Sequence, residues 1–179
     1  SLDEGYYVSY VNAVRGQGGQ NSIGPERDDN LGALRTYELL KAMSVLRVDI
    51  GWLANSRNNS IVDFGLSKSA EETFEFWDKN YTIQRMIRMV RAYKPDIIIP
   101  TFLDIDGQHG HHRAVTRATI EAYDKSNDPE MFPDDDFGPW KISQIFLPAW
   151  SGGGGSYDDE EDPPEATHFI QVGNYNHIF

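Results

Sequence analysis

The chain has 179 residues, no cysteine and a formal net charge of −12, with a sequence pI near 4.7. This length fits one domain with a buried core, and the lack of cysteine excludes disulfides and cysteine-bound metal. The acidic charge argues against nucleic acid or an anionic membrane as the main partner, because both require a basic surface, and no apolar run is long enough to predict a membrane span.

The amino-terminal part of the chain predicts a strand, a glycine-rich loop and a helix. Residues 6 to 14 (YYVSYVNAV) alternate as a strand does. Residues 15 to 21 (RGQGGQN) lack a phosphate-binding fingerprint, so they form either a flexible turn or a loop that allows a ligand to approach the backbone. Residues 31 to 47 predict an amphipathic helix with one apolar stripe, made of Leu39, Met43 and Leu46.

Arg35 and Glu38 lie three positions apart on this helix. They either pair with each other at the surface, or Arg35 faces the site and holds a polar substrate.

Residues 50 to 66 predict an irregular polar stretch with a turn at Asp63. Ser69 and Glu72 match a capping box, which favours a helix over residues 70 to 79. A second helix is predicted over residues 81 to 93 and ends before Pro95. We interpret the apolar side chains of the two helices as core: Phe74, Trp77, Tyr81, Ile83, Met86, Ile87 and Val90.

Residues 96 to 123 (DIIIPTFLDIDGQHGHHRAVTRATIEAY) are the stretch around which the chain is organised. The β-branched run at residues 97 to 99 predicts a buried strand, and a loop with Asp104 and Asp106 follows it. His109, His111 and His112 then stand at the entry to a helix whose stripe is Val115, Ala118 and Ala122. In open α/β sheets, ligands bind at the carboxyl ends of the strands, which is where these histidines are expected.

The spacing of the histidines bears on metal binding. If the helix begins at or before His109, His109 and His112 share one of its faces, and His111 then points elsewhere. Imidazole is the commonest metal ligand, but a catalytic zinc typically has three protein ligands and a water. The spacing alone therefore leaves two interpretations open, a metal or catalytic site and histidines that cap the helix or lie at the surface.

The rest of the chain predicts a loop over residues 124 to 140, a strand over residues 142 to 147 and a last strand over residues 167 to 172. Between these strands, residues 151 to 166 predict a flexible acidic loop. Strands that alternate with helices favour a single α/β domain over residues 1 to 179, with a mostly parallel sheet and helices on both faces.

Three segments resemble the PIG-L or LmbE-like zinc-dependent N-deacetylases, and the resemblance covers nearly the whole chain. The first is VRGQGGQNSIGPE with LGALRTYELLKA after it, and the second is VDFGLSKSAEET. The third is PTFLDIDGQHGHHRA, with LPAWSGGGGSYDDEEDPP downstream. The resemblance implies a Rossmann-like α/β fold. It also implies a soluble bacterial hydrolase, cytoplasmic or exported, that uses Zn²⁺ to remove an N-acetyl group from an amino sugar or its conjugate.

The resemblance also implies roles for single residues. His112 matches the family's histidine zinc ligand, and His109 matches the histidine that polarises the substrate carbonyl or steadies the oxyanion. Arg35 and Asp63 match residues near the sugar site, and Gln20 and Asn21 lie in the loop beside that pocket. His111 replaces what is often an aspartate in the family.

One departure from the family pattern is the absence of its HPDDE motif, which ends the first strand and supplies two zinc ligands and the aspartate general base. We expect the chain to begin just after this motif and to stop within family sequence, so that it is truncated at both ends and inactive alone.

Two alternatives remain open. One is a non-catalytic carbohydrate- or partner-binding domain that has kept the fold without the metal site. The other is a local metal site made of Asp104, Asp106, His109 and His112, because two carboxylates and two imidazoles suit Zn²⁺ or Fe²⁺.

Overall fold

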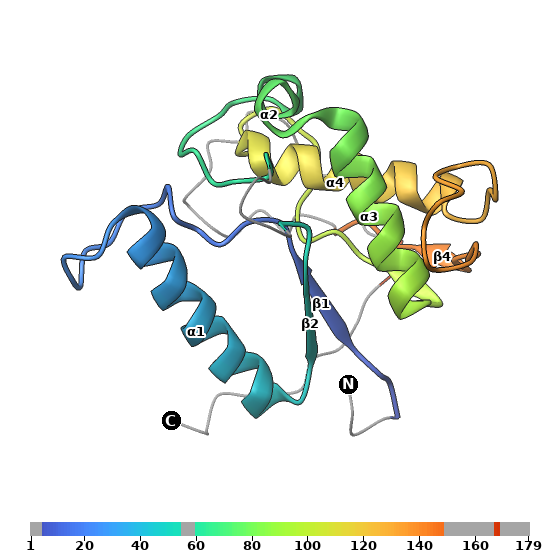
Figure 1. Cartoon of the computed structure of the whole chain (residues 1–179), viewed down its shortest axis with the longest axis horizontal. Coiled ribbons are helices and arrows are strands. Elements are labelled where there is room, and N and C mark those ends of the chain that lie inside the picture. Colours follow the sequence, from blue (N-terminus) through green and yellow to red (C-terminus); the bar gives the residue numbers. More distant parts are fainter. Residues whose placement is uncertain (1–4, 55–59, 149–166, 169–179) are drawn as a thin grey trace.

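The computed structural model describes residues 5–54, 60–148 and 167–168, and these form an α/β arrangement. The order of elements is β1 (Ser9–Asn12), α1 (Asp28–Leu46), β2 (Asp49–Trp52), α2 (Ala70–Trp77), α3 (Lys79–Tyr93), β3 (Ile97–Ile98), α4 (Gly110–Lys125) and β4 (Gln144–Ile145). Figure 1 shows α1 on one side of the β1–β2 pair and α3 on the other, with α2 and α4 across the top of the view. The predicted fold class is confirmed.

The strands form two separate parallel pairs. β1 pairs with β2, with Ser9 opposite Asp49, and β3 pairs with β4, with Ile98 opposite Ile145. Among the residues that the structure describes, no ladder joins one pair to the other. The parallel direction was predicted, whereas the division into two pairs was not.

The core lies between α2, α3, α4 and the strands. Trp77 and Ile87 are fully buried, and Ala114, Ala118 and Ala122 give α4 a flat, buried stripe on which the other helices pack. The small alanines allow this close packing because they fill little space between neighbouring backbones. The predicted apolar stripes of α2, α3 and α4 are therefore confirmed as core.

The helix boundaries follow local capping. Ser69 caps α2, because its Oγ accepts a hydrogen bond from the Glu72 N–H at 3.1 Å, as the capping box predicted. Asp78 then both ends α2 and caps α3, with its Oδ1 accepting from the Tyr81 N–H at 3.1 Å. The second helix thus begins two residues earlier than the sequence indicated.

Two predictions about burial were wrong. On α1, the predicted stripe is not core: Leu46 is 59% exposed, and the buried residues are Leu31 and Gly32 in the first turn. In the β3 segment, Ile97 is 43% exposed and Ile99 is 55% exposed, although a buried strand was predicted. Both errors occur where, among the described residues, no segment packs against the apolar side chains.

Two predictions for the carboxyl-terminal segment lie outside the described residues. They are the acidic loop at residues 151 to 166 and most of the strand at residues 167 to 172. Within the described residues, no helix is both long enough and apolar enough to span a membrane.

Buried arginines join the elements through backbone carbonyls. Arg85 donates from Nε to the Leu53 carbonyl at 2.8 Å, which fixes α3 to the end of β2. Arg91 is 2% exposed and donates to the carbonyls of four residues after α4, namely Ser126, Asp128, Met131 and Phe132. The bonds to the Leu53 and Ser126 carbonyls are buried, where water offers no equivalent donor, and the bonds to Asp128, Met131 and Phe132 are partly buried.

We predict that Arg91→Ala lowers the free energy of unfolding by about 3 kcal/mol or more, because it removes the donor to several carbonyls at once. Urea unfolding followed by circular dichroism measures this loss. The matched control is Lys125→Ala, which removes only an exposed pair with Glu121 on α4 and should cost less than about 0.5 kcal/mol. Equal losses for the two variants would contradict the structural role of Arg91.

Candidate functional site

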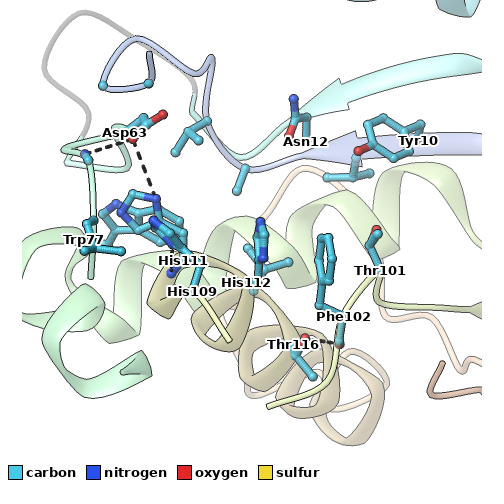
Figure 2. A pocket seen from close by; sticks show the side chains of 18 of the residues that line it. Tyr10, Asn12, Asp63, Trp77, Thr101, Phe102, His109, His111, His112 and Thr116 are labelled. Carbon is cyan, nitrogen blue, oxygen red and sulfur yellow. Dashed lines mark hydrogen bonds and ion pairs between the residues drawn. The ribbon is translucent and has the colours of Figure 1, made fainter. Parts of the chain in front are cut away.

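A pocket of about 420 Å³ opens where β1 and the segment after β3 end. Its wall includes Tyr10 to Val14, the glycine loop at residues 18 to 20, the turn at residues 63 to 66 and the start of α4. This volume lies within the range of small-molecule sites, about 300 to 1,000 Å³. The three histidines at the start of α4 lie together on one side of it (Figure 2), as the strand-end rule predicted.

His112 presents one ring nitrogen to the pocket region in a form suited to a metal. Its Nδ1 lies 3.3 Å from Gln108 Oε1, and because an amide oxygen only accepts, Nδ1 carries the proton and Nε2 keeps its lone pair. Its ring stacks on Phe102 with 3.8 Å between centroids. Burial, and then the neighbouring His109, lower the pKa of His112 to about 4, so the ring is neutral at physiological pH.

His109 occupies the N-cap position of α4 rather than its first turn. Its Nδ1 accepts a hydrogen bond from the His111 N–H at 3.1 Å, which places the ring proton on Nε2. His109 and His112 are 5.5 Å apart between ring centroids. The site therefore pairs a ring nitrogen that can bind a metal, on His112, with a ring N–H that can donate, on His109.

The helical spacing predicted that His111 would point elsewhere if the helix began at or before His109. The helix instead begins at Gly110, and His111 faces the site. It lines the same pocket, is 6% exposed, and stacks on Trp77 with 4.9 Å between centroids. Its Nδ1 lies 3.8 Å from Asp63 Oδ1, and its Nε2 is buried without a hydrogen-bond partner. Burial, and then His109, lower the pKa of His111 to about 4 even though Asp63 acts in the opposite direction.

The predicted sugar-site residues divide into two groups. Asp63 and Gln20 line the pocket. Arg35 lies behind the glycine loop, where it donates to the carbonyls of Gly16 and Gln20 at 2.7 Å each, so it positions the loop and makes no pair with Glu38. Asn21 is not among the lining residues, and its Oδ1 accepts from two backbone N–H groups of its own loop.

Gly110 allows α4 to approach the segment before α2. Its N–H donates to the Ser67 carbonyl at 2.8 Å. A Cβ at this position would overlap Ser67 Oγ and the Ser69 carbonyl and would lie 2.8 Å from Thr73 Oγ1. Only glycine fits, so the sequence H-G-H-H places histidines on both sides of a residue that must be small.

The local metal site of Asp104, Asp106, His109 and His112 is not formed. Both carboxylates pair with arginines of α4: Asp104 accepts from Arg113 at 2.7 Å and also from Arg117, and Asp106 accepts from Arg113 at 2.8 Å. Within the described ranges, no group of three or more metal-binding side chains comes together. That alternative was therefore wrong for these residues.

Sequence reasoning missed several lining residues. Tyr10, Asn12, Thr101 and Phe102 border the pocket from the ends of two strands. The strand-end rule could have found them, because all four lie at or just after a predicted strand. Trp77 was predicted only as core, yet its ring also supports His111.

Comparisons with known proteins identify relatives of the chain. The PIG-L family, described as GlcNAc-PI de-N-acetylase, matches residues 1–123. A 1D-myo-inositol 2-acetamido-2-deoxy-alpha-D-glucopyranoside deacetylase of Streptomyces scabiei is 29% identical over 158 residues, which are 80% of this chain and 47% of that protein. A deacetylase with the same description, numbered 1, from Frankia casuarinae is 29% identical over 70% of this chain and 42% of its own length.

Solved structures share the fold. The N,N'-diacetylchitobiose deacetylase of Pyrococcus horikoshii matches with a TM-score of 0.57 and 22% identity, over 82% of this chain and 51% of that one. A conserved protein of Thermus thermophilus matches with a TM-score of 0.55 and 20% identity, over 82% and 54% of the two chains.

The match over residues 1–123 identifies the family of this α/β protein, which has a histidine pocket at its strand ends. The chain belongs to the PIG-L family and spans about half the length of the curated relatives it matches.

We predict that Gly110→Ala disturbs the site as well as the fold, because the added methyl group forces α4 away from Ser67 and Thr73. The expected result is a loss of about 1 to 3 kcal/mol in unfolding free energy and altered imidazole signals of His109 and His111 in NMR spectra. Gly138→Ala is the control, since a Cβ there meets nothing within 4 Å. Unchanged imidazole signals in Gly110→Ala would contradict the close contact.

A second prediction concerns Asp104. Burial alone would raise the pKa of this carboxyl, but hydrogen bonds from Arg117 and Arg113 lower it below its ordinary value. Its ion pairs therefore stabilise the fold above the unfolded-state pKa of about 3.9 and lose that effect as the pH falls through the lower folded-state pKa. Asp104→Asn should cost about 1 to 2 kcal/mol at pH 7, and the cost should shrink in acid below pH 4.

Urea unfolding of both proteins between pH 7 and pH 3 measures this difference. Asp106→Asn is the matched control, because the Asp106 side chain is 86% exposed and its pair with Arg113 should contribute little. If the loss of unfolding free energy in Asp104→Asn did not change with pH, the stabilising role assigned to the Asp104 carboxylate would be wrong.

Proposed function

We propose that the protein containing this chain removes the N-acetyl group from an amino sugar or its conjugate by metal-assisted hydrolysis of the amide. The observation that carries the proposal is the pairing of a free imidazole nitrogen on His112 with an imidazole N–H on His109 in one pocket of about 420 Å³. Amide hydrolysis needs both functions, a site that binds an electrophile and a donor where negative charge develops.

The metal donor set is incomplete among the described residues. His112 fits as one ligand: its Nδ1–H donates to Gln108, the outer hydrogen bond typical of metal-binding histidines, and burial keeps the ring neutral. A catalytic zinc typically has three protein ligands. The other two ligands are therefore expected from the HPDDE motif of the family, which also supplies the general base. This motif is absent from the sequence.

The chain's own residues perform the remaining tasks. The Nε2–H of His109 donates to the amide oxygen, which becomes negatively charged as the carbonyl carbon turns tetrahedral. Asp63 and Gln20 lie where they can accept and donate hydrogen bonds to sugar hydroxyls. Arg35 acts behind them by holding the loop that carries Gln20. Neutral His112 keeps its lone pair for the metal, which when bound would polarise the amide and activate water.

The names of the relatives support an amino sugar as substrate. The curated relatives act on a glucopyranoside with a 2-acetamido group, and the Pyrococcus horikoshii structure is a diacetylchitobiose deacetylase. The second candidate is a carbohydrate-binding domain without catalysis, which is favoured because the described residues bring together no group of three or more metal-binding side chains.

The test uses the full natural protein that contains this sequence. We expect it to bind about one zinc per chain by elemental analysis and to release free amine from N-acetylglucosamine glycosides. His112→Ala should lose the zinc and the activity together. His109→Ala should keep the zinc but lose about 100- to 1,000-fold in kcat, the usual cost of removing one oxyanion donor.

His168→Ala is the control for both variants, because His168 is exposed and lies outside the pocket lining. Zinc retained by His112→Ala would contradict its assignment as a ligand. A full protein that binds the glycoside, binds no zinc and releases no amine would overturn the proposed hydrolysis in favour of the binding domain.

A further inference from the structure

His111 lines the pocket but takes no part in the chemistry assigned to His109 and His112. It is 6% exposed, and its Nε2 is buried without a hydrogen-bond partner among the described residues. An unpaired buried polar atom is unfavourable for folding, so an apolar side chain of similar size would suit the fold better at this position. The imidazole therefore calls for an explanation in the site itself.

Aromatic contacts hold the His111 ring in one orientation. The ring stacks on Trp77, with 4.9 Å between ring centroids and 28° between ring planes. Phe64 meets it edge-on at 4.5 Å, and His109 meets it at 4.6 Å with the planes inclined by 60°. Because close-packed rings on several sides prevent free rotation, the two ring nitrogens keep fixed directions.

The fixed ring directs its Nδ1 at the carboxylate of Asp63 (Figure 2). Nδ1 lies 3.8 Å from Asp63 Oδ1, which is longer than a hydrogen bond, and contacts of this kind often shorten when a substrate binds. A carboxylate only accepts, so the favourable tautomer of His111 carries its proton on Nδ1. The same Oδ1 accepts from the Gly65 N–H at 3.0 Å.

Asp63 thus has one oxygen held from two sides, by the Gly65 N–H and by the His111 ring. Among the described residues, no donor bonds to its other oxygen, Oδ2, and the side chain lines the pocket. This arrangement leaves Oδ2 available to a ligand as a hydrogen-bond acceptor of fixed position.

His111 also joins two parts of the site that come from different elements. Its backbone N–H donates to His109 Nδ1 at 3.1 Å at the start of α4, and its ring faces Asp63 on the turn before α2. The glycine loop packs directly on that turn, since a Cβ at Gly18 would lie 2.6 Å from the Asp63 carbonyl oxygen. One residue therefore links the amide donor to the carboxylate on the opposite wall.

We propose that His111 is a positioning residue that orients Asp63, so that Asp63 Oδ2 accepts from a sugar hydroxyl while His109 donates to the amide of the same substrate. The inference rests on the proposed function for its substrate, an N-acetylated amino sugar, and assigns recognition of the sugar to a pair of residues. A hydroxyl away from the amide is held equally in the ground state and the transition state. Its loss therefore raises KM and leaves kcat unchanged.

The test uses the full natural protein and the methyl glycoside of N-acetylglucosamine. His111→Asn and His111→Gln both remove the ring and keep an amide N–H, but the asparagine donor lies near the position of Nδ1 and the glutamine donor near that of Nε2. His111→Asn should keep KM within about threefold, whereas His111→Gln should raise it about tenfold. Both variants should keep kcat and the zinc content.

A double-mutant cycle tests whether His111 acts through Asp63. His111→Phe keeps the stacking on Trp77 and removes the N–H, so it carries the test even if the smaller amides prevent folding. It should raise KM about tenfold, and adding it to Asp63→Asn should raise KM no further than Asp63→Asn alone. The matched control is Ala122→Gly, which lowers stability from a buried position near the other end of α4 and should leave KM unchanged.

Three outcomes would overturn the proposal. These are additive effects of His111→Phe and Asp63→Asn on KM, equal KM values for His111→Asn and His111→Gln, and a loss of zinc or kcat in every His111 variant. A wild-type protein that releases no amine would contradict the proposed hydrolysis alone. The same variants are then compared by the calorimetric Kd of the glycoside, where about tenfold weaker binding in His111→Gln supports the positioning role and unchanged binding overturns it.

Discussion

The site depends on the contact between the start of α4 and the segment that leads into α2. Gly110 lies so close to Ser67 and Thr73 that no side chain fits between them, and its N–H is bonded to the Ser67 carbonyl. This contact fixes the first turn of α4, and with it the backbone that carries three histidines. Ser69, which caps α2, belongs to the same segment. The first turns of α2 and α4 therefore hold each other in place, and together they support the histidines rigidly.

The arginines of the chain act mainly as structural donors. Arg85 and Arg91 bind backbone carbonyls around the core, and Arg35 binds those of the glycine loop. Among the described residues that line the pocket, Asp63 is the only carboxylic acid and none is an arginine or lysine, and burial lowers the pKa values of His111 and His112. A pocket of this kind offers hydrogen bonds rather than an electrostatic clamp, which suits the hydroxyls of a sugar better than a phosphate group.

Local sequence signals predicted much of the fold. The capping box at Ser69, the apolar stripes of α3 and α4, and the strand-to-helix position of the histidines depend on residues close together in the sequence, and the structure has them. The burial of Ile97 and Ile99 and of the α1 stripe depends on which segments come to cover them, and sequence patterns do not show that. Likewise, the helical spacing predicted that His111 would point away from the pocket if the helix began at or before His109. His109 is in fact an N-cap residue, so the spacing rule did not apply to it. The roles of His109, His112, Arg35, Asp63, Gln20 and Asn21 stay predictions.

Among the described residues, β1 and β3 each pair with a strand on one side only, and this bears on how the chain behaves at high concentration. An uncovered strand edge is a template for pairing with other chains, and exposed isoleucines strengthen that tendency. The formal charge of −12 opposes it, because each chain repels the next. That repulsion disappears near the pI of about 4.7. Mild acid should therefore make these edges a route to aggregation, whereas neutral buffers of low ionic strength keep the chains apart.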